Sequence, residues 1–152
     1  MIGTALRQFG DAEPGREPID RPCAFGVVER EGRIALVHIV KPEATFHDLP
    51  GGALDAGEIE AEALVREFGE ETGLRVRAGA LFTRANQFMV KEDGTAVNNR
   101  CAFFAAEVEA EAPELKVEDD HTLVWVEPHD ALTRLRHDAH AWAVLAWLRR
   151  RP

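Results

Sequence analysis

The sequence lacks the features of a membrane, secreted or long-nucleic-acid-binding protein. No apolar run approaches the roughly 20 residues that a membrane-spanning helix needs. The N-terminal stretch MIGTALRQFG lacks the basic-then-apolar pattern of a signal peptide, and we therefore expect a cytoplasmic location. Basic residues are outnumbered by acidic ones, 18 to 27, and the net charge of −9 argues against binding of long nucleic acid through its phosphates.

Cysteine is scarce as well, with only Cys23 and Cys101, each in an apolar, strand-like run. Neither has metal-binding partners at short spacing, so we expect two buried free thiols in a reducing compartment. There is no internal repeat and no low-complexity segment. The length of 152 residues and the hydrophobic content of 45% suit one globular domain. We place this domain at residues 21–152, after an irregular arm with several Gly and Pro at residues 1–20.

The order of predicted elements indicates an α+β fold with a mixed sheet and flanking helices. Apolar runs predict strands near residues 4–8, 23–28, 34–40, 46–49, 74–82, 86–90, 97–108 and 121–126. Helical patterns cover residues 58–72, 128–135 and 140–150. The acidic segment 109–120 contains Pro113 and is expected to be an exposed loop, and Asp138 is expected to cap the last helix.

The predicted helix at residues 58–72 has its charges at the unfavourable end. Glu67, Glu70 and Glu71 lie in its last two turns, where the helix dipole disfavours anions and like charges repel. At about 100° per residue, the three carboxylates share one face. Hard cations such as Mg²⁺ and Mn²⁺ bind carboxylate oxygens and often share their shell with phosphates. The face therefore indicates metal-assisted phosphoryl chemistry, and the structural alternative is a solvated acidic face paired with Arg66.

Three neighbouring residues support the metal interpretation. Arg66 can orient a carboxylate by bidentate hydrogen bonds. Gly51 and Gly52, just before the helix, allow the backbone to approach it and to turn a carbonyl towards a metal ion.

The stretch Gly52–Leu74 resembles the Nudix box, G-x5-E-x7-R-E-U-x-E-E-x-G-U, in which U is a bulky apolar residue. Every fixed position of the box is filled, by Gly52, Glu58, Arg66, Glu67, Phe68, Glu70, Glu71, Gly73 and Leu74. The flanks are similar too. A predicted hairpin precedes the box, and a strand containing Trp125 and a C-terminal helix follow it.

The resemblance implies an αβα sandwich and a Mg²⁺- or Mn²⁺-dependent hydrolase that cleaves a nucleoside diphosphate linked to another moiety. Carried over by position, Glu67, Glu70 and Glu71 would be metal ligands, and one of them would orient or deprotonate the attacking water. The carbonyl of Gly51 would be a further ligand, and Arg66 would fix the glutamate side chains.

Other site residues are less constrained by the pattern. Many relatives add an acid from a later loop. Glu118, Asp119 and Asp120 are the candidates here, and we favour Glu118 or Asp120. His47 is a candidate substrate contact, and a partly exposed strand-end histidine is the alternative. Four further candidates for the floor of the substrate pocket lie on predicted strands: Arg84, Gln87, Asn99 and Arg100. His137, His140 and Trp125 are expected to serve packing.

Two classes of function remain open at the level of sequence. The first is a Nudix hydrolase, and the second is a non-catalytic Nudix-fold nucleotide-binding or regulatory module. Such modules usually lose box carboxylates, which are all present here. The partner is expected to be a small nucleotide: a nucleoside triphosphate, ADP-ribose, another nucleotide sugar, a dinucleoside polyphosphate or capped RNA. A homodimer in which the N-terminal arm contacts the partner is also consistent with the sequence.

Overall fold

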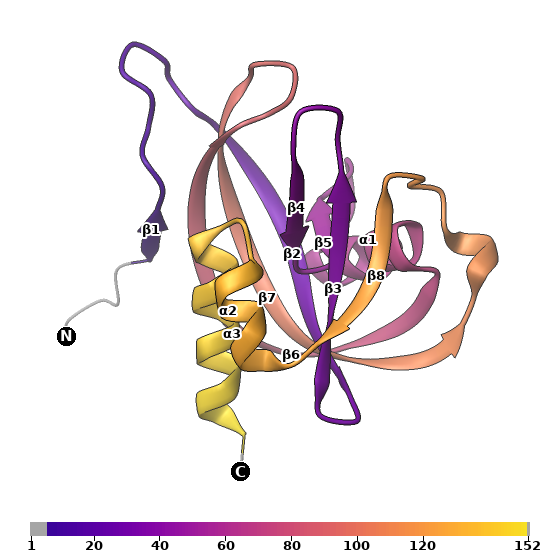
Figure 1. Cartoon of the computed structure of the whole chain (residues 1–152). Helices are drawn as coiled ribbons and strands as arrows, with labels where there is room; N and C mark the ends of the chain where they lie inside the picture. Colours follow the sequence, from indigo (N-terminus) through magenta and orange to yellow (C-terminus); the bar gives the residue numbers. More distant parts are fainter. Residues whose placement is uncertain (1–5, 152) are drawn as a thin grey trace.

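A mixed eight-stranded sheet forms the centre of the computed structural model, which describes residues 6–151 (Figure 1). Strands follow the order β1-β6-β7-β2-β3-β4, with β5 beside β2 and β8 beside β3. They are β1 (Arg7–Phe9), β2 (Ile19–Arg30), β3 (Arg33–Val40), β4 (Thr45–Asp48), β5 (Gly51–Ala53), β6 (Leu74–Val90), β7 (Ala96–Glu111) and β8 (His121–Val126). The β1–β6 and β2–β7 pairs are parallel, and the other pairs are antiparallel.

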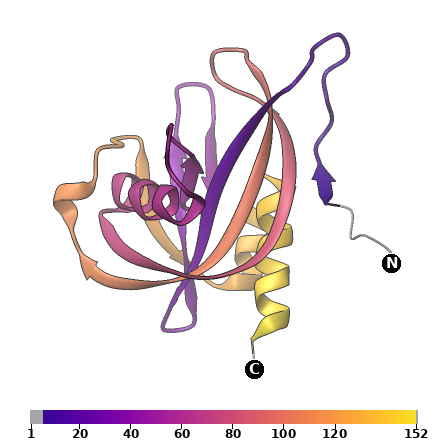
Figure 2. The same ribbon diagram turned by 180° about the vertical axis from the view of Figure 1, so that it is seen from behind.

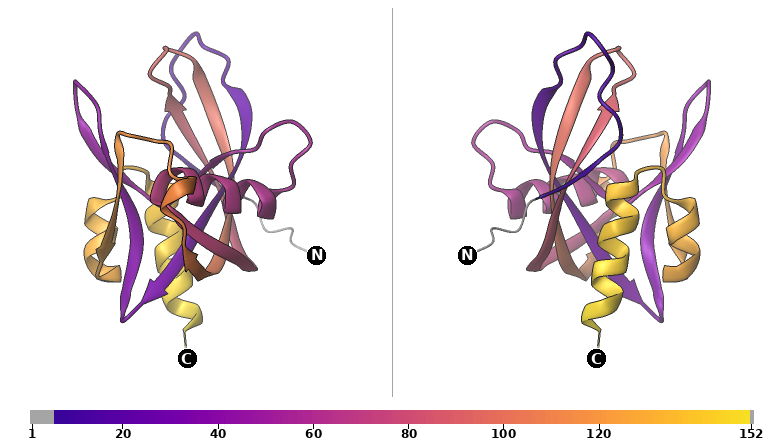
Figure 3. Two further views of the ribbon diagram at one scale, coloured as in Figure 1. Left: turned by 90° about the vertical axis from the view of Figure 1, so that its right-hand side faces the viewer. Right: turned by 90° about the vertical axis from the view of Figure 1, so that its left-hand side faces the viewer.

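Helices cover the sheet from opposite sides. In Figure 1, α2 (Pro128–Arg134) and α3 (Asp138–Arg150) lie in front of the strands, and in Figure 2 α1 (Glu60–Thr72) lies in front. The side views in Figure 3 show the same separation. The α+β class and the αβα sandwich predicted from the sequence are therefore confirmed.

Alternation along β2 and β7 divides the core between these two sides. Phe25 and Phe103 face α2 and α3, where they join Val144 and Trp147 in one buried cluster. The adjoining residues of the same strands pack on the other side, against Leu64 and Phe68 of α1. This two-residue period gives each helical layer its own apolar face of the sheet.

α1 is fixed at both ends by short-range interactions. The carboxylate of Glu62 accepts a hydrogen bond from the backbone N–H of Ile59, at 3.0 Å. Gly73 ends the helix in the left-handed conformation, at φ 72°, and its N–H bonds to the Gly69 carbonyl at 2.9 Å. The helix thus starts two residues later than predicted, and Glu58 belongs to the preceding loop.

Three expectations about elements were wrong. The predicted break between residues 82 and 86 is absent, because Thr83–Ala85 pair with β7 and keep β6 continuous. Residues 109–111 extend β7, and a 3₁₀ turn follows at Pro113–Leu115. Asp138 is the first residue of α3, and the N-cap position belongs to His137.

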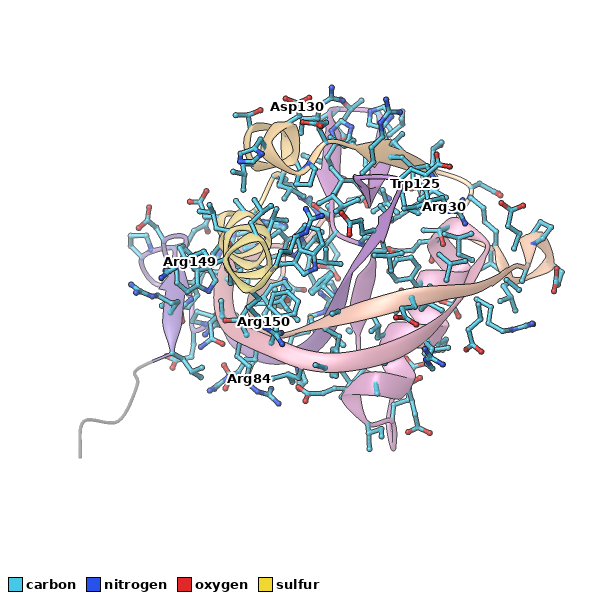
Figure 4. All side chains as sticks on the ribbon, turned by 90° about the horizontal axis from the view of Figure 1, so that it is seen from below. Arg30, Arg84, Trp125, Asp130, Arg149 and Arg150 are labelled. Carbon is cyan, nitrogen blue, oxygen red and sulfur yellow. The ribbon has the colours of Figure 1, made fainter. Side chains whose placement is uncertain are left out.

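Other expectations about packing hold. Cys23 and Cys101 are buried free thiols, placed opposite each other on β2 and β7. His140 is buried in the core, as expected. Trp125 is partly buried. The Arg30 guanidinium lies over the Trp125 ring, 4.7 Å from the ring centre (Figure 4).

The N-terminal arm contributes a strand to the sheet. Arg7–Phe9 pair in parallel with Ala85–Gln87 at the outer edge of β6, and the start of the strand predicted at 4–8 lies outside the described residues. No helix within residues 6–151 is long and apolar enough to cross a membrane.

Candidate active site

The glycine pair brings the chain against the acidic end of α1. Gly51 has φ 145°, and a β-carbon there would lie 2.1 Å from the Ala24 carbonyl oxygen. A β-carbon on Gly52 would lie 2.8 Å from the carboxyl carbon of Glu67. No side chain fits at Gly51, and a side chain at Gly52 would displace the Glu67 carboxylate, so the glycines set how closely backbone and acid approach each other.

Glu71 is the most enclosed carboxylate of the site, with 7% of its surface exposed. One of its oxygens accepts the Gly51 N–H at 2.9 Å, and the other lies 3.2 Å from Nε2 of His121. Burial raises the pKa of Glu71 to about 7, although these contacts favour its charged form.

His121 joins Glu71 to a second carboxylate. Its Nδ1 lies 2.7 Å from Asp120, and the second Asp120 oxygen accepts a hydrogen bond from Nζ of Lys41 at 2.6 Å. Burial disfavours the charged imidazolium, but contacts with Glu71 and Asp120 outweigh it and raise the His121 pKa to about 8. Lys41 is the main cause that lowers the Asp120 pKa to about 2, followed by His121. Basic and acidic side chains thus alternate in one row, in the order Lys41, Asp120, His121, Glu71.

Arg66 orients the outer carboxylates. Its Nη1 donates to Glu67 at 3.0 Å and to Glu70 at 3.2 Å, while Nε donates to Glu58 at 2.7 Å. Its Nη2 also donates to the Ala53 carbonyl at 3.0 Å, which joins β5 to α1. Burial raises the pKa of Glu67 even though Arg66 opposes this effect. One guanidinium thus donates to three acids and lies 3.3 Å from a fourth, Asp55, so the site is short of positive charge.

Glu118 reaches the site because the end of α1 needs hydrogen-bond donors. The free carbonyl of Glu70 accepts the N–H groups of Val117 and Glu118, at 2.9 and 3.1 Å. These bonds hold the chain after the 3₁₀ turn against the helix. Ligand atoms of Glu118, Asp120 and His121 lie within 4.8 Å of one another.

A cavity of about 500 Å³ adjoins these acids. Its walls include Gly51, Gly52, Glu67, Glu71, Glu118 and His121 at one end. The rest of its lining comes from the β3–β4 and β6–β7 hairpins, from β2 and β7, and from the segment before α3. Both hairpins extend towards the same end of the molecule in Figure 1.

The structure brings together only part of the predicted site. Glu67, Glu71, Gly51 and Glu118 line the cavity, and so does Asn99. Asp120 is not among the lining residues and is held by Lys41 and His121, as described above.

Glu70 and the remaining candidates lie outside the lining of this cavity. Arg84 forms a two-bond ion pair with Glu60, 2.7 Å for each bond, and Figure 4 shows it at the margin of the molecule. Arg100 is exposed and paired with Asp20. Gln87 is buried, where its Oε1 accepts the Ala139 N–H at 3.0 Å. His47 is stacked on His38, with ring centres 4.7 Å apart.

The sequence predicts no role in the site for three cavity residues, which are His121, Arg21 and Lys41. β8 brings His121 alongside β3, and β2 brings Arg21 alongside β7, so their positions depend on long-range strand pairing. The adjacent Asp120-His121 dipeptide, an acid beside an imidazole, is the only local signal we find for any of them.

The geometry agrees with the comparison to known families, in which the NUDIX domain profile matches residues 20–148. The chain belongs to the Nudix family. It is therefore a hydrolase of the family that acts on pyrophosphate bonds.

Individual Nudix proteins are also similar. A Mycobacterium tuberculosis H37Rv protein named "Putative 8-oxo-dGTP diphosphatase 2" is 34% identical over 110 residues, which cover 69% of this chain and 74% of that protein. A NUDIX hydrolase from Nitrosomonas europaea matches with a TM-score of 0.75 at 20% identity, over 88% of this chain and 90% of that chain. The MutT protein from Methanosarcina mazei Go1 matches with a TM-score of 0.69 at 21% identity, over 88% of this chain and 96% of that chain. The two solved structures establish the likeness of fold.

The donor set of this Nudix site suits a hard divalent cation. Three carboxylates, of Glu67, Glu71 and Glu118, line one end of the cavity beside Gly51. Oxygen donors of this kind are those that Mg²⁺ and Mn²⁺ prefer. Burial is the main cause of the raised pKa of Glu67, and the nearby charges of Glu70 and Glu118 add to it, so a bound cation would favour its charged form. The residues present therefore fit such an ion.

Proposed function

We propose that the protein is a Mg²⁺- or Mn²⁺-dependent pyrophosphohydrolase that cleaves a nucleoside diphosphate linked to another moiety. The observation that carries the proposal is the convergence of Glu67, Glu71 and Glu118 beside Gly51 in one cavity. Glu71, Glu118 and the Gly51 carbonyl would hold the ion, and Glu67 would lie beside the coordinated water. When bound, the ion would neutralise the diphosphate and lower the pKa of this water.

Within this proposal, Glu67 accepts the proton of the attacking water. Both oxygens of Glu71 already have partners, and Glu70 lies outside the cavity lining. Glu67 is bonded to Arg66 through Oε1, and its Oε2 has no hydrogen-bond donor among the described residues. The water oxygen forms a new bond to phosphorus, its proton passes to Glu67, and the anhydride P–O bond breaks with its electron pair on the leaving phosphate.

The electrostatics support these roles. Burial raises the Glu67 pKa towards neutrality, which suits a group that must take up a proton. Arg66 holds one carboxylate oxygen and restricts the side chain, while His121 and Gly51 restrict Glu71. These residues thus position the acids before substrate arrives.

The substrate is tested by a screen with Mg²⁺ and Mn²⁺, in which products are identified by mass. The name of the mycobacterial relative makes 8-oxo-dGTP the first compound, and ordinary triphosphates, ADP-ribose and a dinucleoside polyphosphate complete the series. We expect release of a nucleoside monophosphate or diphosphate with a distinct leaving phosphate. Binding of nucleotides without turnover of any would favour the non-catalytic binding module.

The assignment of Glu67 predicts a large loss of activity in Glu67→Gln. Removal of a proton acceptor typically costs about 10²–10⁴-fold in rate, and we expect kcat to fall in this range. Glu114→Gln is the matched control, because Glu114 is exposed and lies on the 3₁₀ turn away from the cavity lining. Near-wild-type kcat in Glu67→Gln, with a folded protein, would remove Glu67 from this role.

A further inference from the structure

Arg21 differs from the other cations that line the cavity. Lys41 lies 2.6 Å from Asp120, Arg136 lies 2.6 Å from Asp48, and Lys91 lies 3.9 Å from its own acidic neighbour on the β6–β7 turn. Within residues 6–151, no carboxylate oxygen lies within 4.0 Å of the Arg21 guanidinium. Its side-chain contacts are with Asn99 Oδ1 at 3.2 Å and Cys23 Sγ at 3.8 Å.

Asn99 has a hydrogen-bond donor that is poorly used. Its side chain is buried, at 4% exposure, and its Nδ2 donates only to the thioether sulfur of Met89, at 3.0 Å. Thioether sulfur is a weak acceptor. The orientation of the amide follows from chemistry, since Arg21 can only donate and so must face the amide oxygen. The N–H groups of Asn99 therefore remain available to a stronger acceptor in the cavity.

Arg21 and Asn99 together present hydrogen-bond donors on one wall of the cavity. They lie opposite each other on the parallel strands β2 and β7, and both line the cavity. The Asn99 oxygen is already occupied by Arg21, so what remains is an uncompensated positive charge and amide N–H groups. Such a wall matches oxygen acceptors on a ligand and mismatches donor groups. Nearby Met89 and Phe46 give the same cavity apolar surface.

We propose that Arg21 and Asn99 form a substrate subsite for a group rich in oxygen acceptors. This inference rests on the proposed function, because it assigns part of the same cavity. The group is a phosphate of the substrate or the keto edge of its base. A guanine presents O6 and N7 as acceptors, whereas an adenine presents an N6 donor at the matching position.

The test measures binding rather than turnover. Calorimetry with Mg²⁺ and the α,β-methylene analogues of GTP and ATP compares wild type with Arg21→Gln. Loss of one hydrogen bond to a charged group weakens affinity by about tenfold or more, and we expect this change in Kd. Arg100→Gln is the control, because Arg100 neighbours Asn99 on β7 but is exposed and paired with Asp20.

Asn99→Asp provides a second variant of nearly the same shape. The new carboxylate would pair with Arg21 internally, and we expect it to weaken binding although the guanidinium is retained. Equal losses for both analogues identify the phosphate as the ligand group, and a larger loss for the GTP analogue identifies the base edge. Unchanged Kd values in both folded variants would overturn the subsite.

The outcome for the wild type separates this inference from the proposed function. Binding that depends on Arg21, without hydrolysis of any nucleotide, would keep the subsite and overturn the hydrolase proposal. Hydrolysis that is unchanged in Arg21→Gln and Asn99→Asp would keep the hydrolase proposal and overturn the subsite. Failure of the wild type to bind either analogue would overturn the subsite.

Discussion

His140 shows how strongly one buried residue can couple this fold to pH. Its Nδ1 accepts the Leu49 N–H at 3.1 Å, and burial lowers its pKa to about 3, with His137 and Arg136 acting in the same direction and Asp48 opposing them. The unfolded chain binds this proton near pH 6.5, so it holds more protons than the folded chain between the two pKa values. Stability must therefore fall as pH drops through this window.

The predicted size of this effect is measurable by denaturant unfolding. Between about pH 7.5 and 4.5 this histidine should cost the wild type roughly 2–3 kcal/mol of unfolding free energy. In His140→Asn the amide oxygen can still accept the Leu49 N–H, but no group titrates there. Over this pH interval, we expect His140→Asn to lose roughly 2–3 kcal/mol less unfolding free energy than the wild type loses. Parallel pH profiles for the two proteins would show that His140 is not the cause.

Single residues also show which parts of the candidate site are brought together by local sequence. Glu67 and Glu71 lie four residues apart on one helix, and local geometry alone brings them to one face. His121 and Arg21 reach the cavity through pairing of β8 with β3 and of β2 with β7, which no short motif encodes. Sequence therefore predicts the acids of the candidate site better than the residues around them.

At the scale of elements, α1 combines an unfavourable charge pattern with a well-formed end. No basic residue occupies its last turn, and Gly73 closes it at φ 72°. An L-residue in the left-handed conformation costs about 1–2 kcal/mol, so Gly73→Ala should lower the unfolding free energy by this amount. Gly73→Asn should cost less, because asparagine tolerates this conformation. Equal unfolding free energies for wild type and Gly73→Ala would contradict this account.

The two misread segments have a common physical cause. The sequence predicts a break between residues 82 and 86, but pairing with β7 keeps Thr83–Ala85 extended. The segment 109–120 looks exposed by composition, yet Ala112 is buried and its N–H bonds to the Gly73 carbonyl at 2.7 Å. In both places, partners distant in sequence override local preference. Elements with a complete local pattern, such as α1, are predicted well.

At the scale of the whole molecule, the net charge of −9 and the buried acids lead us to expect that cation binding stabilises the fold. A ligand that binds only the folded state adds about 2.7 kcal/mol when its concentration is one hundred times Kd. We expect Mn²⁺ or Mg²⁺ to raise the melting temperature at constant ionic strength, and EDTA to reverse the gain. Glu71→Gln should reduce the rise. A shift that persists undiminished in this variant would indicate general charge screening.

The central strand β2 has a consequence for how the molecule opens. It pairs with β7 over residues 19–28, with β5 at residues 23–25 and with β3 at residues 29–30. The amides of residues 23–25 lie between two partner strands, whereas the turns after β3 and β6 lie at the tips of their hairpins, where Lys41 N–H bonds to the Ala44 carbonyl and Lys91 N–H to the Thr95 carbonyl. Hydrogen exchange should therefore be slowest along β2 and fastest at these turns. The floor of the cavity would remain fixed while its entrance fluctuates, which allows a nucleotide to enter without partial unfolding of the domain.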